Sequence, residues 1–108
     1  MNKINLTPHT LNLYDEDGIP VATIPPSGDV ARVAVRRVAN GNIDGIPVFK
    51  TTYGQVAGLP APRPGTIYIV SGMVRAHPDV RDRADVFQPG ELLRDTDGRP
   101  VGAIGLSQ

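Results

Sequence analysis

The sequence predicts a mainly β protein: one compact antiparallel β barrel or sandwich with a single short helix. Three observations favour this fold class. The apolar residues are mostly Val, Ile, Leu and Ala, with only 5% aromatic residues, and β-branched side chains fit a pleated sheet better than a helix. The apolar segments are short and alternate with polar residues. Twelve Gly and 11 Pro fall between these segments, where they act as turn signals. A chain of 108 residues has the size of one domain, so residues 1–108 are predicted to form a single β-rich domain.

Turn signals divide the N-terminal half into two hairpins. Residues 11–14 and 19–24 alternate in polarity around an Asp-Glu-Asp-Gly turn at residues 15–18, which predicts the first hairpin. Residues 30–38 form the longest strand candidate, because Ala31, Val33 and Val35 alternate with polar residues as in a half-buried antiparallel strand. Its partner is predicted at residues 46–52. The pair Asn40-Gly41 suits a tight turn, and the loop continues through Asp44-Gly45.

The C-terminal half is predicted to hold a central strand, a helix and a second hairpin. Residues 54–65 are rich in Pro and Gly and predict an extended loop; a domain boundary there is rejected, because neither flank is long enough for its own core. Residues 66–70 are nearly all apolar and predict a strand covered on both faces. Ser71 is a suitable N-cap for a helix over 73–77. Residues 85–87 predict a short strand, and residues 92–94 and 100–106 a terminal hairpin.

One pattern, L-x-D-x-D-G-x-P-V-x-x-I, occurs twice, at residues 13–24 and 93–104, with a shorter copy at residues 44–48. Asp and Gly suit a tight turn, and Pro at the first position of a strand spares a ladder hydrogen bond. Convergence on one hairpin solution is the favoured interpretation, and internal duplication is the alternative.

Charge and composition exclude several classes of protein. Eleven basic and 11 acidic residues give a formal net charge of zero, which argues against binding to nucleic acid. There is no Cys, so neither a disulfide framework nor a zinc–thiolate site can form. The N-terminus lacks the apolar stretch of a signal peptide, and no apolar run approaches the roughly 20 residues that span a bilayer. These features predict a cytoplasmic protein with no membrane partner.

The candidate catalytic and metal-binding motifs fail on spacing. The Asp-x-Asp-Gly segments resemble the start of a calcium loop, but the Glu required at position 12 is replaced by Pro26 and Leu106. The two histidines, His9 and His77, stand in no recognisable nucleophile motif, and no Ser lies in a G-x-S-x-G elbow. A structural role is predicted for both. The dense mixed charge between Arg75 and Asp85 is expected to be mostly a solvated face with weak ion pairs. The sequence thus predicts a protein that is not an enzyme, with no metal and no cofactor.

An anion site is the one ligand site that the sequence suggests. Ser71 and Gly72 follow an apolar strand and open a helix, where free N–H groups favour anions. Arg32, Arg63 or Arg75 would supplement them, since Arg suits contact with carboxylate or phosphate. Neither a G-x-G-x-x-G nor a P-loop signature is present, and an ordinary strand-to-helix turn is the alternative. The candidate ligand-binding set is Ser71, Gly72, Arg32 and Arg75.

Four segments together resemble a family of small uncharacterised proteins encoded in bacteriophage, prophage and bacterial genomes: residues 5–9, 25–28 with 31–33, 65–71 and 89–95. The resemblance implies a viral accessory context and carries no functional residue. The predicted function is a non-enzymatic binding module, an accessory protein that binds a host protein or sequesters a small anionic ligand. The alternative is a structural or assembly protein, such as a minor virion component. A small β domain must manage its edge strands, so we also expect self-association, as a two-fold dimer.

Overall fold

The computed structural model describes all residues 1–108 and is 54% strand and 4% helix, which confirms the predicted fold class. In chain order the elements are β1 (Asn2–Asn5), β2 (Leu11–Tyr14), β3 (Pro20–Ile24), β4 (Arg32–Ile43), β5 (Ile46–Ala57), β6 (Thr66–Ile69), α1 (Gly72–Arg75), β7 (Val86–Arg94) and β8 (Pro100–Ser107). Six strands form one sheet that is nearly barrel-shaped, in the order β1-β6-β7-β8-β2-β3, while β4 and β5 pair only with each other. No helix in the chain combines the length and the apolar character needed to cross a membrane.

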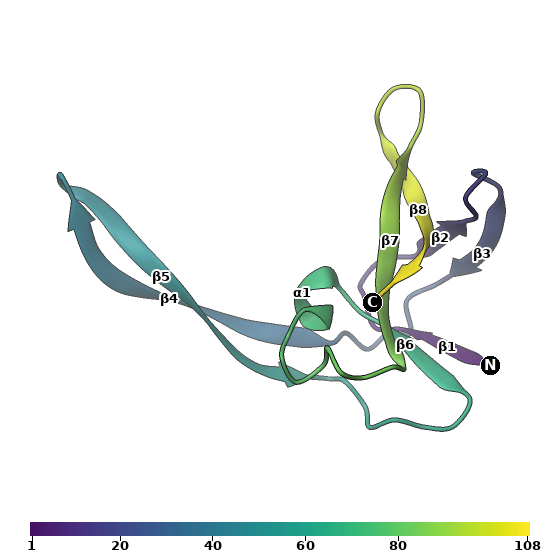
Figure 1. The fold of residues 1–108 in the computed structure, drawn as a ribbon, viewed down its shortest axis with the longest axis horizontal. Helices are drawn as coiled ribbons and strands as arrows, with labels where there is room; N and C mark the ends of the chain where they lie inside the picture. The colour runs from purple at the N-terminus through teal and green to yellow at the C-terminus, as the bar shows by residue number, and fades with distance from the viewer.

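The molecule divides into an arm and a body. Figure 1 shows the β4–β5 hairpin leaving the six-stranded sheet and projecting away from it. We call residues 32–57 the arm and the remaining residues the body. Three strand pairs are antiparallel, namely β2–β3, β4–β5 and β7–β8, and these join neighbours in sequence. The other three pairs, β1–β6, β6–β7 and β2–β8, are parallel. The sequence pattern predicted neither these parallel pairs nor strand β1.

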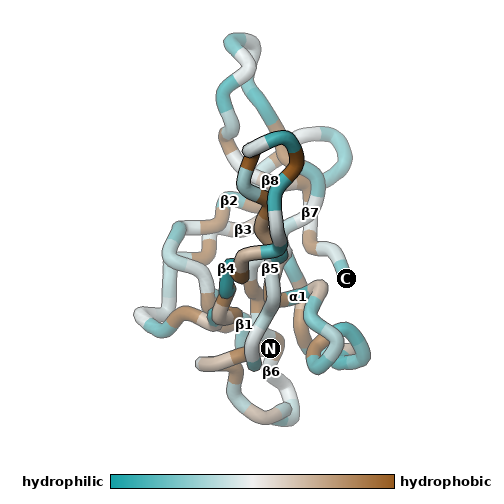
Figure 2. Tube along the Cα trace, turned by 90° about the vertical axis from the view of Figure 1, so that its left-hand side faces the viewer, coloured by the Kyte–Doolittle hydropathy of each residue, from teal (hydrophilic) through white to brown (hydrophobic).

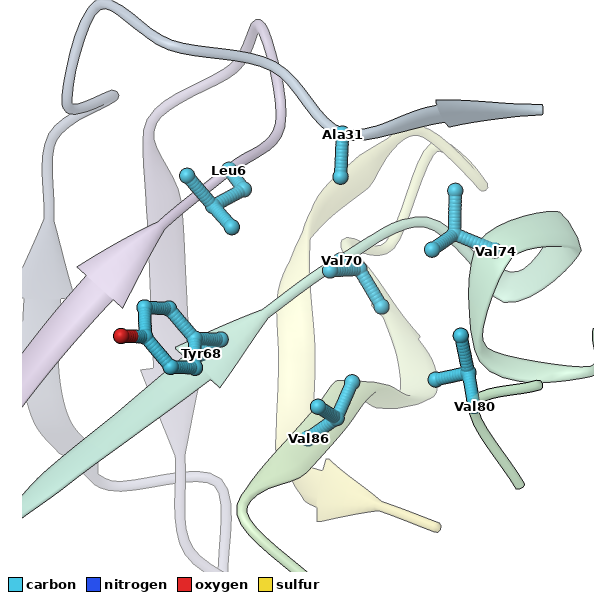
Figure 3. Close-up of a cluster of buried hydrophobic side chains, with 7 residues drawn as sticks. All are labelled: Leu6, Ala31, Tyr68, Val70, Val74, Val80 and Val86. Atoms are coloured by element: carbon cyan, nitrogen blue, oxygen red, sulfur yellow. The ribbon is translucent and has the colours of Figure 1, made fainter. Parts of the chain in front are cut away.

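The core of the body is small and lies around β6 and α1. Seven buried apolar residues form it: Leu6, Ala31, Tyr68, Val70, Val74, Val80 and Val86. Figure 3 shows them converging from β6, β7, the helix and the segments that follow β1 and precede β4. The predicted burial of residues 66–70 on both faces is confirmed, since four of these five residues are buried. Only 14 of 108 residues are buried, so the core is small, and it holds β6, α1 and the start of β7 against the root of the arm.

A buried Asn joins three segments at the edge of the core. The Asn5 side chain donates to the carbonyls of His9, at 2.7 Å, and Ile24, at 3.1 Å. Its oxygen accepts from the N–H and the hydroxyl of Thr7. Asn5 thus satisfies its hydrogen-bonding groups in a buried place, where an unpaired amide would be costly.

The two repeated segments form hairpins with the same turn. In the first, the Asp15 carboxylate accepts from the N–H groups of Asp17 and Ile19. In the second, Asp95 accepts in the same way from Asp97 and Arg99. Both hairpins also carry a register shift one residue before the turn. The predicted hairpins are confirmed, and their turns follow from local Asp-to-backbone hydrogen bonds.

The second predicted hairpin is present, but it is longer than expected and its turn lies at a different position. Its turn is Asp44-Gly45, both with positive φ (52° and 82°), as a two-residue turn requires. Asn40-Gly41 is not the turn: it lies within β4, where the strand register shifts between Ala39 and Asn42. β5 runs on through Ala57, so the predicted loop at residues 54–65 begins only at Gly58. The expected half-burial of the strand holds only near its root, because Ala31 is buried but Val35 is exposed.

Smaller differences lie in the helix and the strands that follow it. The helix covers Gly72–Arg75 rather than residues 73–77, and Ser71 is its N-cap, as predicted, accepting from the Val74 N–H at 3.4 Å. The strand predicted at residues 85–87 and the one at 92–94 are parts of one strand, β7. It changes partner along its length, from β6 at Val86 and Phe87 to β8 from Gln88 onward.

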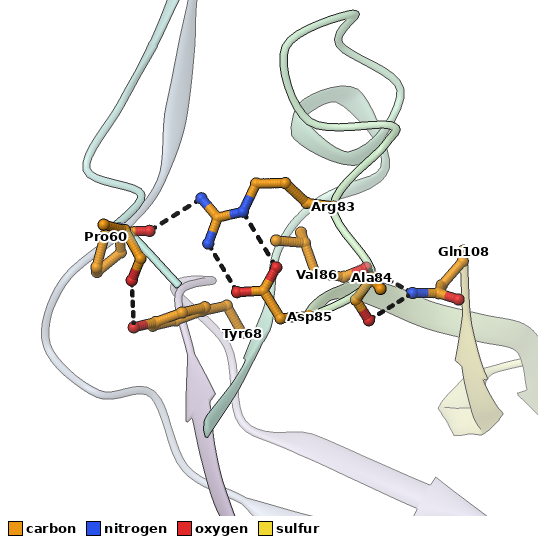
Figure 4. Close-up of polar contacts among 8 residues, drawn as sticks. Pro60, Tyr68, Arg83, Ala84, Asp85, Val86 and Gln108 are labelled. Carbon is orange, nitrogen blue, oxygen red and sulfur yellow. Dashed lines mark hydrogen bonds and ion pairs between the residues drawn. The ribbon is translucent and has the colours of Figure 1, made fainter. Parts of the chain in front are cut away.

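The mixed-charge segment after the helix is only partly the solvated face that we predicted. Asp79, Arg81 and Asp82 are exposed. Arg83 and Asp85 instead form an ion pair of 2.7 Å whose side chains are only 20% and 19% exposed. Arg83 also donates to the Pro60 carbonyl, at 2.9 Å, and fastens the Pro-rich loop to the sheet (Figure 4). The guanidinium hydrogen bonds hold the pKa of Asp85 below its ordinary value.

Candidate functional site

The arm carries apolar and basic side chains on both of its faces. Directly paired residues of an antiparallel hairpin share a face. One face therefore holds the pairs Val35–Tyr53, Arg37–Thr51 and Ala39–Phe49, and the Arg37 guanidinium lies 4.2 Å from the centre of the Phe49 ring. The other face holds Arg36–Thr52 and Val38–Lys50. Because Arg36 and Arg37 are adjacent, neither face is purely apolar, and the arm has no single core-facing side.

Six large apolar side chains of the arm are exposed, by 44% to 65%: Val35, Val38, Ile43, Ile46, Phe49 and Tyr53. Figure 2, seen from the side of the arm, shows brown apolar residues interspersed with teal polar ones along the chain. Isolated apolar residues on a surface are ordinary, but six large exposed ones on a single hairpin favour an interaction site. The arm is therefore the most distinctive candidate surface of the molecule.

The root of the arm is held by the segment after the helix. Nε2 of His77 lies 2.9 Å from the Gly54 carbonyl of β5, and Nδ1 accepts from the Asp79 N–H at 3.1 Å. Both ring nitrogens of His77 are thus engaged by backbone, in the structural role predicted for it. Beside this contact lies a groove of about 390 Å³, the arm-root groove, lined by Val33, Tyr53, Met73, Ala76, His77 and Pro78.

The largest hollow of the body lies on one face of β2, β7 and β8. This sheet hollow has a volume of about 660 Å³ and is lined by residues 9–13, Pro89, Leu92 and residues 100–103. No Asp, Glu, Lys or Arg lines it. Leu92 and Val101 are 50% and 36% exposed there. An open apolar hollow of this size on a small domain suits an apolar segment of another protein.

The predicted anion-binding residues are only partly brought together. Arg32 and Ser71 line one hollow of about 240 Å³, together with Thr7, Pro8 and Met73 among others. Gly72 follows Ser71 directly and is exposed. The helix behind them has a single turn, so too few peptide dipoles align to give the half charge of a long helix. The Ser71 hydroxyl already accepts from the Val74 N–H.

Arg75 does not belong to that hollow. Its residue is only 7% exposed, and its guanidinium donates to the Arg81 carbonyl at 3.2 Å. Its Nε is buried without a partner. Arg75 therefore closes the turn over residues 76–81 from inside, and the sequence could not foresee this, because its position at the end of the single helical turn depends on tertiary packing. No group of three or more His, Cys, Asp or Glu side chains with metal-binding geometry is formed.

Charge is divided unevenly between the arm and the body. The arm has four basic residues, Arg32, Arg36, Arg37 and Lys50, against one acid, Asp44, and so carries a net charge of +3. The body has the remaining seven basic and ten acidic residues, a net charge of −3. The zero net charge of the chain conceals this division. It was readable in the sequence, but only once the limits of the arm were known.

Comparison of the chain with models of protein families, with curated proteins and with solved structures finds no match.

Proposed function

We propose that this chain is a non-enzymatic binding module that works as an assembly of identical chains joined through the arm. The observation that supports this proposal most strongly is the accessible surface area of the chain. A compact monomer of 11.5 kDa exposes about 5,800 Å², whereas this chain exposes 7,413 Å². The excess is about 1,600 Å² per chain, and buried twice in a dimer it falls in the range of obligate interfaces, roughly 2,000–5,000 Å².

The shape of the molecule supports the same proposal. The radius of gyration is 16.9 Å, against about 13 Å for a compact domain of this length. A two-stranded hairpin is marginally stable on its own in water, and the outer arm has no cover from its own body (Figure 1). A partner surface would supply the missing cover. A second copy is present wherever the chain is made, and it brings the same excess of uncovered surface.

The non-enzymatic part of the proposal is supported by what the reactive side chains already do. His77 spends both ring nitrogens on backbone groups, and the Ser71 hydroxyl caps the helix. A self-assembling module fits either role that the sequence leaves open, an accessory factor or an assembly component. The family resemblance stays a prediction, and the identity of neighbouring genes would separate the two roles.

We expect light scattering at tens of micromolar to give a mass near twice 11.5 kDa. The matching variant replaces residues 36–52 by Asn-Gly, because Val35 and Tyr53 are paired and a two-residue turn can join them. This shortened chain should keep its strand circular dichroism and cooperative melting but have the mass of a monomer. A full-length chain that stays at 11.5 kDa would refute the proposal.

The hollow that holds both Arg32 and Ser71 favours a second candidate function, the capture of a small anionic ligand. If a phosphate-bearing ligand binds there, it should raise the melting temperature by mass action, with about 2.7 kcal/mol of stabilisation at a hundredfold excess over Kd. A thermal-shift panel of nucleotides and cyclic dinucleotides measures this. Arg32→Ala should weaken the shift, and Arg63→Ala, which changes a different hollow, should not. If no compound in the panel shifts the melting temperature, this second candidate is wrong.

A further inference from the structure

Three surfaces of a second copy are available to the arm: the partner's arm, its arm-root groove and its sheet hollow. Charge favours one of these three surfaces over the other two. Two arms lying side by side would bring two segments of net charge +3 together, with Arg36, Arg37 and Lys50 of both copies close to one another. Like charges in an interface that excludes water are strongly unfavourable. The arm-root groove has no acidic residue in its lining, and the segment that forms its body side, residues 72–81, carries two Arg and one Asp, so it offers the arm no net compensating charge.

The sheet hollow, by contrast, is formed by strands of two acidic hairpins. The β2–β3 hairpin, residues 11–24, contains three acids and no basic residue. The β7–β8 hairpin, residues 86–107, contains three acids and two Arg. Together the two hairpins that line the hollow carry a net charge of −4, while the lining itself has no charged residue. An apolar hollow on two acidic hairpins complements an arm whose faces combine apolar side chains with Arg and Lys.

We propose that the arm of one copy seats in the sheet hollow of a second copy, and reciprocally, so that two chains exchange arms about a two-fold axis. This inference rests on the proposed function and names the surface that the arm meets. Each strand of the arm has 12 residues and spans about 40 Å. The tip lies far from the hollow of its own body (Figure 1), so the contact is made between copies.

The exposed apolar area is sufficient for such a dimer. Three of the exposed apolar side chains, Val35, Phe49 and Tyr53, lie on one face of the arm. At roughly 100 Å² each, this face of the two arms brings about 600 Å², and the two hollows that cover it lose a similar area, about 1,200 Å² in total. That already reaches the lower end of a stable interface, about 1,200–2,000 Å² in total. Reciprocal exchange makes the same contact twice and closes the assembly at two chains, because a two-fold interface is self-complementary.

Cross-linking of two singly substituted chains tests the exchange directly, since the natural chain has no Cys. One chain carries Thr51→Cys on the arm. The other carries Thr10→Cys, at an exposed residue that lines the sheet hollow, and is labelled with nitrogen-15, so that mass spectrometry separates mixed from self-linked products. A short bismaleimide is added to an equal mixture after the chains have exchanged. We expect the arm-to-body product to dominate and the arm-to-arm and body-to-body products to be minor.

The possible outcomes separate this inference from the proposed function. A dominant arm-to-arm product from Thr51→Cys alone would overturn the proposed binding of the arm in the sheet hollow. It would show instead that the two arms contact each other. A dimer in light scattering with no arm-to-body product would also overturn the binding of the arm in the sheet hollow, but it would still support the proposed self-assembly. A chain that is monomeric in light scattering overturns both.

The repeated hairpins provide a matched pair of variants. Val101 and Val21 occupy the same position of the repeat, but Val101 lines the sheet hollow and Val21 does not. Val101→Asp should weaken dimer formation about a hundredfold, because it places an unpaired charge against an apolar surface. Val21→Asp should leave the dimer dissociation constant within about threefold of the natural chain. Melting curves of both variants check that the body is folded. If both variants weakened the dimer equally, or if neither weakened it, the proposed binding of the arm in the sheet hollow would be contradicted.

Discussion

Replacing Gly102 by Ala is expected to destabilise the fold by about 3 kcal/mol and to lower the melting temperature by about 15 °C. A Cβ at this position would lie 2.2 Å from the backbone oxygen of Asn12 and 2.5 Å from the Tyr14 ring. Both residues belong to β2, which pairs in parallel with β8. Backbone cannot move aside as a flexible side chain does, so β2 would have to separate from β8 and the sheet would open between its two hairpins.

Ala22→Gly is the matched control for this substitution. Ala22 stands at the same position of the repeated pattern, in the edge strand β3, where no further strand approaches it. Removing its methyl group should cost only about 0.5–1 kcal/mol, the usual penalty of Gly in a strand. Urea unfolding of the two variants, followed by circular dichroism, gives both values. Equal losses would mean that the close approach of β2 to Gly102 does not limit stability.

The comparison of these two positions shows what the sequence can reveal about the fold. The pattern around Asp15 and Asp95 predicted both hairpins correctly, because the turn is made by hydrogen bonds between residues two and four apart. The difference between Ala22 and Gly102 was visible in the sequence, but its reason was not. It depends on β2 lying beside β8, a contact between residues that are some 90 positions apart.

In the arm, the sequence predicted a strand correctly but not its burial. Alternation at Ala31, Val33 and Val35 correctly predicted a strand, since side-chain period is a local property. Burial is not local, and beyond Val33 the body provides nothing for β4 to pack against. The choice between Asn40-Gly41 and Asp44-Gly45 as the turn was equally undetermined, because both pairs tolerate positive φ. The pairing of Ile43 with Ile46 at the tip decides it.

For the candidate anion site, too, the sequence placed some residues correctly and others not. The proposal that Arg32 faces Ser71 required two segments distant in sequence to meet, and both line one hollow. Arg75 was predicted to supplement the site because Arg suits contact with carboxylate or phosphate. Its side chain instead turns inward to the Arg81 carbonyl, a contact that depends on how residues 76–81 fold back over the helix.

Asp85→Asn is expected to destabilise the fold by about 2 kcal/mol, because Asp85 receives two charge-assisted hydrogen bonds from Arg83 in a largely water-excluded place. The pair fastens β7 to the Pro-rich loop, since Arg83 also donates to the Pro60 carbonyl and Tyr68 donates to Ala61 of the same loop (Figure 4). The control is Asp82→Asn, three residues earlier, where the carboxylate is exposed and makes no ion pair. It should change the free energy of unfolding by less than about 0.5 kcal/mol.

The cost of Asp85→Asn should also depend on pH in a defined direction. The pKa of Asp85 in the folded chain lies below its ordinary value of 3.8, because the Arg83 hydrogen bonds favour the charged carboxylate. The unfolded chain therefore takes up the proton first as the pH falls, and the stabilisation is complete above the ordinary pKa and is lost as the pH falls through the folded one. Urea unfolding at pH 7, 5 and 3 should give a constant difference between the natural chain and the variant at the first two values and a smaller one at pH 3. A difference that stays constant down to pH 3 would mean that the charge of Asp85 does not stabilise this contact.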